Sequence, residues 1–456
     1  MNRCRLSICI IIRLLTGNFL FTIDKMERIY LDHAAATPLD KRVAASILKS
    51  QSIFGNASSL HTRGQEAKKL LEDSRKKIAK IIGASSSEIV FTPSGTESVN
   101  LAILGIARAY KKQGTHIITS KIEHLSVLKA CEYLEKKEGF KISYLDVQPN
   151  GVIDPELIKK SLRPDTVLTS IMYANNEIGT IQPIAKISKV IRNFRKFKIA
   201  NLKLKINEKL PVFHVDACQA AGALELNVQK LGVDLMTLNG SKIYGPKGTG
   251  CLFVRRGTDI EPMIVGGSQE MGRRAGTENV PLLAGFAMAL EQVDKNRVKE
   301  SARLTKLRDN LIDHLLQNFQ GRALKISLNG DPILRLPNNI NISFSNDNTS
   351  VWPHKSIVDP IRARGRQGRP TSDGVSGEMM VLALDRKGIE VSTGSACTSA
   401  YTGQSHVLKV LFEAQLRTVK TTVNSGNLRI TLGRSTTKKD LDYFLKVLLG
   451  IIAKLR

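Results

Sequence analysis

The sequence lacks a long hydrophobic run, a Cys-x-x-Cys pair and any excess of acidic residues. No stretch of about 18 apolar residues occurs, so we expect no membrane span and exclude a multi-span membrane protein. The six cysteines are scattered, which predicts neither a disulfide framework nor a metal site and favours a reducing compartment, the cytoplasm. Hydrophobic residues make up 42% of the chain, which argues against disorder, collagen and coiled coil.

Acidic residues are few beside the basic ones. The 456 residues include 41 Asp and Glu against 68 Lys and Arg, a formal net charge of +27. Such a charge raises nucleic acid or an anionic membrane surface as a hypothesis. The sequence contains no zinc-finger, basic-zipper or aromatic RNA-binding motif, so we expect no sequence-specific nucleic-acid binding, and weak contact with tRNA stays open. Residues 1–25, 186–210 and 351–376 together carry +14 of the charge.

The length predicts two or three domains. The first 25 residues are basic and apolar, and they are either a dispensable extension or a targeting segment, since Met26 is an alternative start. We expect an N-terminal segment at 26–40 that packs with the small domain. A large domain should follow at 41–294, with a basic insertion at 186–210. The small C-terminal domain should span 295–456, with an insertion at 351–376 and a cysteine-bearing loop at 392–405.

Strand-like and helix-like segments alternate along most of the chain. Apolar, β-branched runs such as 115–120, 166–174, 211–217 and 233–240 precede polar or glycine-bearing turns. This alternation predicts an α/β fold with a mostly parallel sheet covered by helices on both faces. In such folds the chemistry gathers at the carboxyl ends of the strands.

A lysine and an aspartate follow two of these runs. Lys242 stands between an apolar run and a Gly-Pro-Lys-Gly turn, and a partly desolvated lysine there is nucleophilic enough to form a Schiff base. Asp216, 26 residues upstream, ends a strand, and a protonated pyridine nitrogen is a suitable partner for a buried carboxylate. A surface lysine and a helix-capping aspartate are the alternatives. Together the two residues favour pyridoxal 5′-phosphate (PLP) as cofactor.

Two further strand ends carry polar residues. Gly95 and Thr96 lie in a small-residue turn that opens a helix, where free N–H groups and the Thr hydroxyl suit a phosphate, although an ordinary helix cap is the alternative. His124 ends another strand and could stack on a ring, or it could be a packed histidine. A run of small residues at 392–400 surrounds Cys397, which predicts an accessible and reactive thiol.

With these motifs in order, the chain resembles the cysteine desulfurases, the NifS/IscS-like branch of the class V aminotransferases of PLP fold type I. The resemblance runs from about residue 28 to 437 and omits the two insertions. It rests on the stretches 29–40, 54–69, 91–100, 119–128, 172–183, 213–222, 234–250, 266–279, 335–344, 392–400 and 428–437.

The resemblance implies a role for each matching residue and a large domain with a seven-stranded-type sheet. The expected catalytic residues are Cys397, Lys242 and His124. Groups expected to hold PLP are Lys242, Asp216, Gln219, Asn175, Gly95, Thr96, Ser241, His124 and, from the other subunit of a homodimer, Thr277. The expected substrate contacts are Arg429, which would hold the α-carboxylate of L-cysteine, and Asn175. Two positions depart from the usual pattern: Ser241 stands where many relatives have histidine, and Asn239 where serine is common.

The implied activity is removal of sulfur from L-cysteine, which leaves L-alanine and a persulfide on Cys397. The sulfur would pass to an acceptor protein for iron–sulfur cluster assembly or tRNA thiolation, and the sequence does not identify the acceptor. A selenocysteine lyase or an aminotransferase of the same family is the alternative.

Overall fold

The computed structural model describes residues 8–14, 17–23, 28–202, 209–320, 324–346, 376–394, 405–416 and 426–454. Its largest sheet has seven strands in the order β4-β10-β9-β8-β7-β5-β6. All run parallel except β10, which is antiparallel to both of its neighbours. The strands are β4 (Ile89–Thr92), β5 (His116–Ser120), β6 (Lys141–Leu145), β7 (Thr166–Met172), β8 (Val212–Asp216), β9 (Leu235–Asn239) and β10 (Gly250–Val254). The predicted α/β class with a mostly parallel sheet is confirmed.

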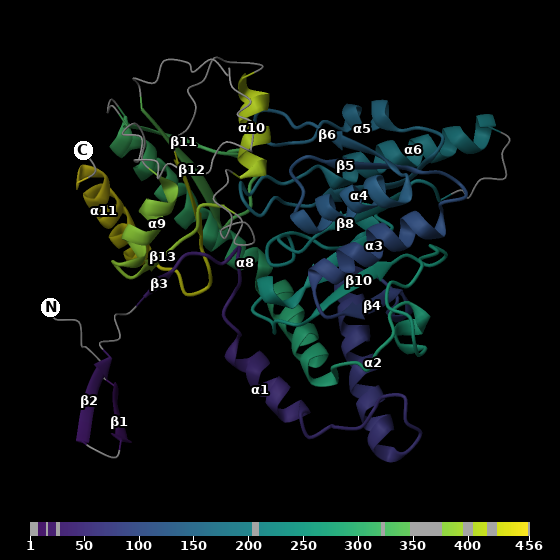
Figure 1. Ribbon diagram of the computed structural model, residues 1–456, viewed down its shortest axis with the longest axis horizontal. Helices are drawn as coiled ribbons and strands as arrows, with labels where there is room; N and C mark the ends of the chain where they lie inside the picture. The colour runs from purple at the N-terminus through teal and green to yellow at the C-terminus, as the bar shows by residue number, and fades with distance from the viewer. Residues whose placement is uncertain are drawn as a thin grey trace, which may run out of the picture.

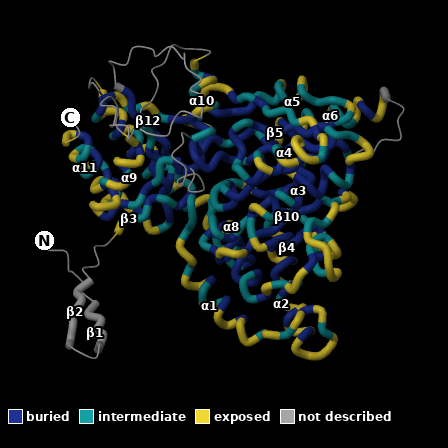
Figure 2. Tube along the Cα trace, in the orientation of Figure 1, coloured by how far each residue is buried: buried dark blue, intermediate teal, exposed yellow. Residues whose placement is uncertain are grey.

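Helices cover this sheet on both faces, and the strands are its most buried part (Figures 1 and 2). Successive strand residues enter different cores, as the alternation of side chains in a strand requires. Phe213 and Val215 belong to one hydrophobic core, whereas Val212 belongs to the other. The first core is shared with α2 (Thr62–Ile82), α6 (Ile184–Leu202), α7 (Val228–Leu231) and α8 (Val280–Phe319), and the second with α3 (Gly95–Ala109) and α4 (Leu125–Glu138).

A smaller unit is built on a three-stranded antiparallel sheet with its own core. It comprises β11 (Leu324–Leu328), β12 (Asn339–Asn346) and β14 (Gly426–Thr431), with α9 (Gly377–Asp385) and α11 (Lys438–Lys454). The short strand β3 (Ile29–Tyr30) pairs in parallel with β13 (Ile389–Glu390) of this unit. The N-terminal segment thus crosses from the small unit to α1 (Lys41–Ser50) on the large one (Figure 1).

The expected boundary at 294–295 falls inside a helix. α8 is 40 residues long; its first half contacts α1 and α2 of the large unit, and its later residues pack in the core of the small unit. The two units therefore share one continuous helix.

The first part of the expected basic insertion at 186–210 lies in a helix. Residues 184–202 form α6, and Ile187 and Ile191 of this helix are buried in the main core. Its basic residues Lys186, Lys189 and Arg192 are exposed on the other side of the helix. Helical periodicity thus places the charges on one face of a structural element.

The expected insertion at 351–376 and the N-terminal extension at 1–25 are only partly described by the structure. Residues 351–375 lie outside the described residues. In the N-terminal extension, β1 (Ile8–Leu14) and β2 (Gly17–Ile23) pair antiparallel. Over the residues that the structure describes, no helix is both long and apolar enough to cross a membrane.

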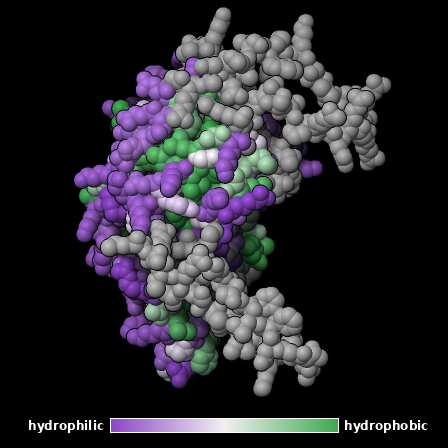
Figure 3. Space-filling model, turned by 90° about the vertical axis from the view of Figure 1, so that its left-hand side faces the viewer, coloured by the Kyte–Doolittle hydropathy of each residue, from purple (hydrophilic) through white to green (hydrophobic). Residues whose placement is uncertain are grey.

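Apolar and polar side chains are mixed on the side of the molecule where α9 and α11 lie. Figure 3 shows apolar surface in the middle of this face, between polar regions. Met379 and Leu382 of α9 are among the exposed large apolar side chains.

Candidate active site

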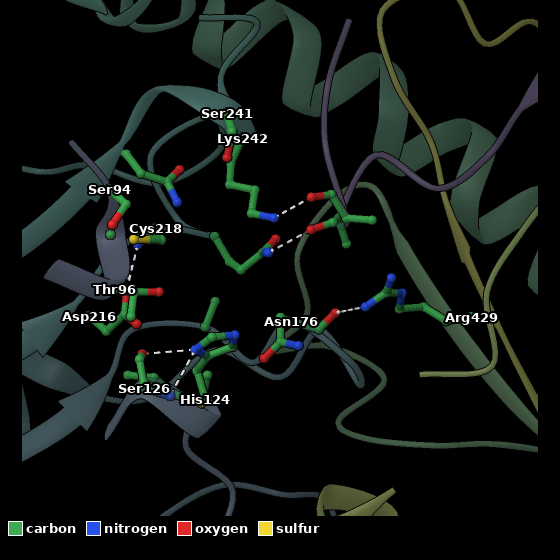
Figure 4. Close-up of a pocket in the computed structure, with 17 residues that line it drawn as sticks. Ser94, Thr96, His124, Ser126, Asn176, Asp216, Cys218, Ser241, Lys242 and Arg429 are labelled. Atoms are coloured by element: carbon green, nitrogen blue, oxygen red, sulfur yellow. Dashed lines mark hydrogen bonds between the residues drawn. The ribbon is translucent and has the colours of Figure 1, made fainter. Parts of the chain in front are cut away.

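A cavity of about 260 Å³ lies where the parallel strands end. The segments that follow β4, β5, β7, β8 and β9 line it, and the N-terminal segment and β14 complete its wall. The predicted site residues that line this cavity are Gly95, Thr96, His124, Asp216, Gln219, Ser241, Lys242 and Arg429 (Figure 4). The structure thus brings together residues that lie more than 300 positions apart in the sequence.

Lys242 ends the short 3₁₀ turn after β9 and points at the N-terminal segment. Its Nζ donates a hydrogen bond to the carbonyl oxygen of Ala35. Gln219 Nε2 donates to the carbonyl oxygen of Ala34 at 3.0 Å, so two predicted residues meet adjacent carbonyls (Figure 4). The backbone N–H of Thr37 bonds to the Ser241 carbonyl at 2.9 Å and fixes the same segment against the lysine turn.

Asp216 is the last residue of β8 and is 8% exposed, with its exposed part in the cavity wall. Its Oδ1 accepts a hydrogen bond from the Cys218 backbone N–H at 3.0 Å. Among the described residues, no cation forms an ion pair with this carboxylate. The carboxylate is therefore oriented by the turn and is available to a cationic group in the cavity.

Cys218 also lines the cavity, although no sequence motif marks it as a site residue. Burial raises the pKa of its thiol well above the ordinary value, and the negative charge of Asp216 adds to the effect. Cys218 is therefore a neutral thiol at neutral pH. Its position two residues after the strand-ending Asp216 was the signal that could have identified it as a cavity residue.

His124 is the N-cap residue of α4. Its Nδ1 accepts a hydrogen bond from the Ser126 backbone N–H at 3.2 Å and lies 2.8 Å from the Ser126 hydroxyl (Figure 4). Because Nδ1 accepts, the proton of the neutral ring is on Nε2. The ring is thus oriented by its own helix, with the Nε2–H as the donor of the neutral imidazole.

The N-terminus of α3 forms a cradle at one end of the cavity. Ser94 caps the helix by accepting from the Glu97 backbone N–H at 3.1 Å. A Cβ on Gly95 would lie only 2.9 Å from Cys218 Sγ and 3.1 Å from Asn239 Nδ2, so glycine leaves room that any other residue would fill. Asn239 Oδ1 is buried without a hydrogen-bond partner among the described residues. Free backbone N–H groups at a helix N-terminus suit an anion such as phosphate.

Asn175 is not among the residues that line the cavity, and its predicted contacts with cofactor and substrate stay a prediction. Its side chain is fully buried and donates to the Ile122 carbonyl at 2.8 Å, while its Oδ1 accepts from the backbone of Glu177 and Ile178. The next residue, Asn176, lines the cavity instead. The hydrogen bonds of the Asn175 amide stabilise the turn that places Asn176 in the cavity wall.

Arg429 reaches the cavity from β14 of the small unit and is 1% exposed. Its Nη1 donates to the Asn176 carbonyl at 3.0 Å (Figure 4). Its Nη2 donates to Asp32 Oδ1 at 2.7 Å. The Arg429 Nε is buried without a partner among the described residues. A buried guanidinium with an unused donor suits a small carboxylate.

Two further predicted residues are not part of this cavity as described. Thr277 lines a separate cavity of about 170 Å³ together with Thr92, Pro93 and Glu270. Its predicted contact with the phosphate in a second subunit stays a prediction. Cys397 lies outside the described residues. Among the residues that are described, no group of three His, Cys, Asp or Glu side chains could hold a metal ion.

Comparisons with known proteins agree with this architecture. The class-V aminotransferase family matches residues 29–351. The chain is 45% identical to the cysteine desulfurase IscS of Dictyoglomus turgidum and 39% identical to IscS 1 of Archaeoglobus fulgidus, covering 94% of this chain and 96% and 97% of the relatives. A solved NifS-like protein superposes with a TM-score of 0.76 at 32% identity, covering 93% of this chain and 99% of the other. The protein SspA, solved in complex with cysteine, has a TM-score of 0.67 at 30% identity, with 89% and 98% covered. The chain belongs to the class-V aminotransferase family and, within it, to the cysteine desulfurases.

Proposed function

We propose that this protein uses PLP to remove sulfur from L-cysteine, giving L-alanine and a persulfide on Cys397. The observation that carries the proposal is one cavity in which Lys242, Asp216, the N-terminus of α3 and Arg429 meet. Each of these groups suits a different part of a PLP-bound amino acid. The family membership and the relative solved with cysteine support the same substrate.

The residues present fit PLP. The lysine amine suits an aldehyde, the buried carboxylate of Asp216 suits a protonated pyridine nitrogen, and the Gly95 cradle suits a phosphate. Thr96 and Ser241 line the cavity near these groups and add hydroxyl donors. When bound, PLP would act as an electron sink for the pair left on the substrate Cα.

The chain's own residues would perform the remaining tasks. Arg429 would hold the substrate carboxylate through its guanidinium, which Asp32 and the Asn176 carbonyl already orient. Lys242 Nζ would move the Cα proton, and His124 Nε2 would act as a second acid or base. The low exposure of Arg429 and Asp216 indicates a site with little bulk water, which strengthens these electrostatic interactions.

The sulfur step conserves atoms and electrons without an external oxidant. The Cys397 thiolate would attack the substrate Sγ, forming a sulfur–sulfur bond while the carbon–sulfur bond breaks. The electron pair of the broken bond stays with the carbon fragment, which is protonated to L-alanine. The persulfide sulfur would then pass to an acceptor protein in iron–sulfur cluster assembly or tRNA thiolation. We further propose a homodimer in the cytoplasm, with Thr277 completing the phosphate site of the other subunit.

The cofactor assignment is tested by absorbance. The purified protein should be yellow with a band near ~420 nm, and Lys242→Ala should lose this band. Lys247→Ala, five residues away and exposed, is the matched control and should keep it. A colourless protein without PLP would overturn the assignment.

The sulfur chemistry is tested by alanine formation from L-cysteine. Cys397→Ala should abolish alanine formation but keep the spectral change that L-cysteine causes, because the thiol acts after the substrate has bound. Cys4→Ala, outside the family match, should behave as the unaltered protein. Unchanged alanine formation by Cys397→Ala would remove this thiol from the mechanism.

A further inference from the structure

The described residues on either side of Cys397 both contact one buried side chain, that of Glu177. Cys397 follows Gly394 by three positions and precedes Ser405 by eight. The Ser405 hydroxyl donates to Glu177 Oε2 at 2.5 Å. Gly394 lies so close to the same carboxylate that a Cβ there would be 3.0 Å from Oε2. The Glu177 carboxylate therefore bonds to Ser405 and leaves no room for a side chain at position 394.

Glu177 is itself held in a rigid turn. Its backbone N–H donates to Asn175 Oδ1 at 2.8 Å, and its carbonyl accepts from Asn339 Nδ2 at 3.2 Å and Asn341 Nδ2 at 3.1 Å. The side chain is 1% exposed. A buried carboxylate is costly unless it is hydrogen-bonded, so the bond from Ser405 stabilises the arrangement.

Further contacts connect the same two ends to the candidate active site. Ser392 exchanges backbone hydrogen bonds with Arg429, at 2.6 and 3.2 Å. His406 Nε2 lies 2.9 Å from the carbonyl oxygen of Glu123, the residue before His124. The Ser405 hydroxyl also accepts from the Leu408 N–H and so caps α10 (His406–Leu416).

The turn that carries Glu177 also touches the substrate arginine. Asn176 precedes Glu177, lines the cavity and accepts a hydrogen bond from Arg429 Nη1 through its carbonyl. Because this backbone is fixed on both sides, the carboxylate of Glu177 is a rigid reference point between the substrate site and the ends of the cysteine-bearing segment. A long acidic side chain with this placement is unexplained by cofactor or substrate binding.

We propose that Glu177 is a positioning residue for sulfur transfer, which acts by holding Ser405 through a hydrogen bond and by packing closely against Gly394. It does not touch the substrate; it sets where the chain enters and leaves the segment that bears the thiol. The inference rests on the proposed function, since it assigns Glu177 to the thiol step of that reaction.

The test compares Glu177→Gln, Ser405→Ala and the double variant. Glu177→Gln keeps the size of the side chain but removes its charge, and Ser405→Ala removes the donor from a different element. Glu156→Gln is the matched control, since its side chain is 59% exposed and pairs with Lys159 on the same helix. Persulfide on Cys397 is followed by mass spectrometry in a single turnover with L-cysteine, and the L-cysteine-dependent spectral change is recorded in parallel.

Both single variants should form the persulfide about tenfold more slowly, the size expected from the loss of one hydrogen bond to a charged group. The concentration of L-cysteine that gives half of the spectral change should stay within about twofold, because Arg429 is intact. The double variant should be no slower than the slower single one, since the two groups act as a pair. The rate at which Cys397 is alkylated without substrate does not depend on turnover. This rate should change in the two single variants and stay the same in the control.

Unchanged persulfide formation in both single variants would overturn the proposal, as would an equal loss of the spectral response, which would place Glu177 in substrate binding. If the unaltered protein itself forms no persulfide, the proposed function fails instead. If Glu177→Gln does not fold, Ser405→Ala still decides the matter, because it leaves the turn intact.

Discussion

Glu123 is a fully buried carboxyl group one residue before His124. It accepts hydrogen bonds from the Ser120 hydroxyl at 2.6 Å and the Met172 backbone N–H at 3.0 Å, but its Oε2 has no partner among the described residues. Burial raises the pKa of Glu123 to about 8, and the charge of Asp216 adds to the effect. The group therefore keeps its proton at neutral pH in the folded protein.

This proton makes the stability depend on pH. The ordinary pKa of 4.5 describes Glu123 in the unfolded chain, so between about pH 4.5 and 8 the folded state holds a proton that the unfolded state has lost. The free energy of unfolding should fall as the pH rises through this window. In Glu123→Gln, which has no proton to lose, the fall from pH 5 to 8 should be smaller by up to a few kcal/mol.

Urea unfolding at pH 5, 6.5 and 8 measures this difference. Glu156→Gln, an exposed carboxyl on α5 (Pro155–Ser161), should keep the pH dependence of the unaltered protein. Identical pH slopes for Glu123→Gln and the unaltered protein would contradict the assignment of this proton to Glu123.

Single residues also show where sequence patterns stop being informative. Asp216 and Lys242 were found because each follows an apolar run, and the end of a parallel strand has a known direction. Asn175 and Asn176 are adjacent in a turn, where no period of two or 3.6 residues tells which side chain faces the cavity. The buried amide of Asn175 and the cavity-lining amide of Asn176 are distinguished only by the contacts of the folded turn.

At the scale of elements, the site is a property of strand ends. The alternation of strands and helices predicted the sheet, and therefore predicted that Thr96, His124, Asp216 and Lys242 would meet at one edge. The division between units was less predictable, because α8 continues through the expected boundary at 294–295 without a proline or glycine. A helix shared by two units leaves no composition change to detect.

The N-terminus of α3 supports a prediction at this scale. In Gly95→Ala, the new methyl group would lie 2.9 Å from Cys218 Sγ, so the helix end or the thiol must move. We expect PLP to bind about tenfold more weakly, as titration by absorbance would show, because the phosphate cradle is narrowed. The melting temperature should fall by a few degrees at most.

Relief of the clash is the control for this prediction. Cys218→Ala alone should bind PLP normally, and adding it to Gly95→Ala should restore part of the affinity, since the sulfur atom nearest to the new methyl group is gone. Normal affinity in Gly95→Ala, or no recovery in the double variant, would show that the cradle does not depend on this contact.

At the scale of the whole molecule, the positive charge is partly carried by structural elements. α6 places Lys186, Lys189, Arg192 and Lys196 on its exposed side while Ile187 and Ile191 fill the core. The charge of α6 can therefore be changed without altering the packing of its buried face. Net charge of this kind affects solubility and non-specific association rather than the fold.

Changing these four residues to Glu should lower the salt concentration at which the protein leaves a heparin column. The net charge falls by eight, and the circular dichroism spectrum should stay unchanged because the buried face of α6 is intact. The same four changes to Gln lower the charge by four and should give an intermediate shift. Elution at the original salt concentration would show that α6 takes no part in polyanion binding.

The pair between Asp32 and Arg429 joins residues that are 397 positions apart. During synthesis the chain leaves the ribosome from its N-terminus, so Asp32 is exposed long before Arg429 exists. The parallel sheet and its strand ends can form earlier, but the wall of the cavity that β14 supplies cannot. A chain that stops short of β14 would therefore lack Arg429 and the part of the cavity wall that this strand supplies.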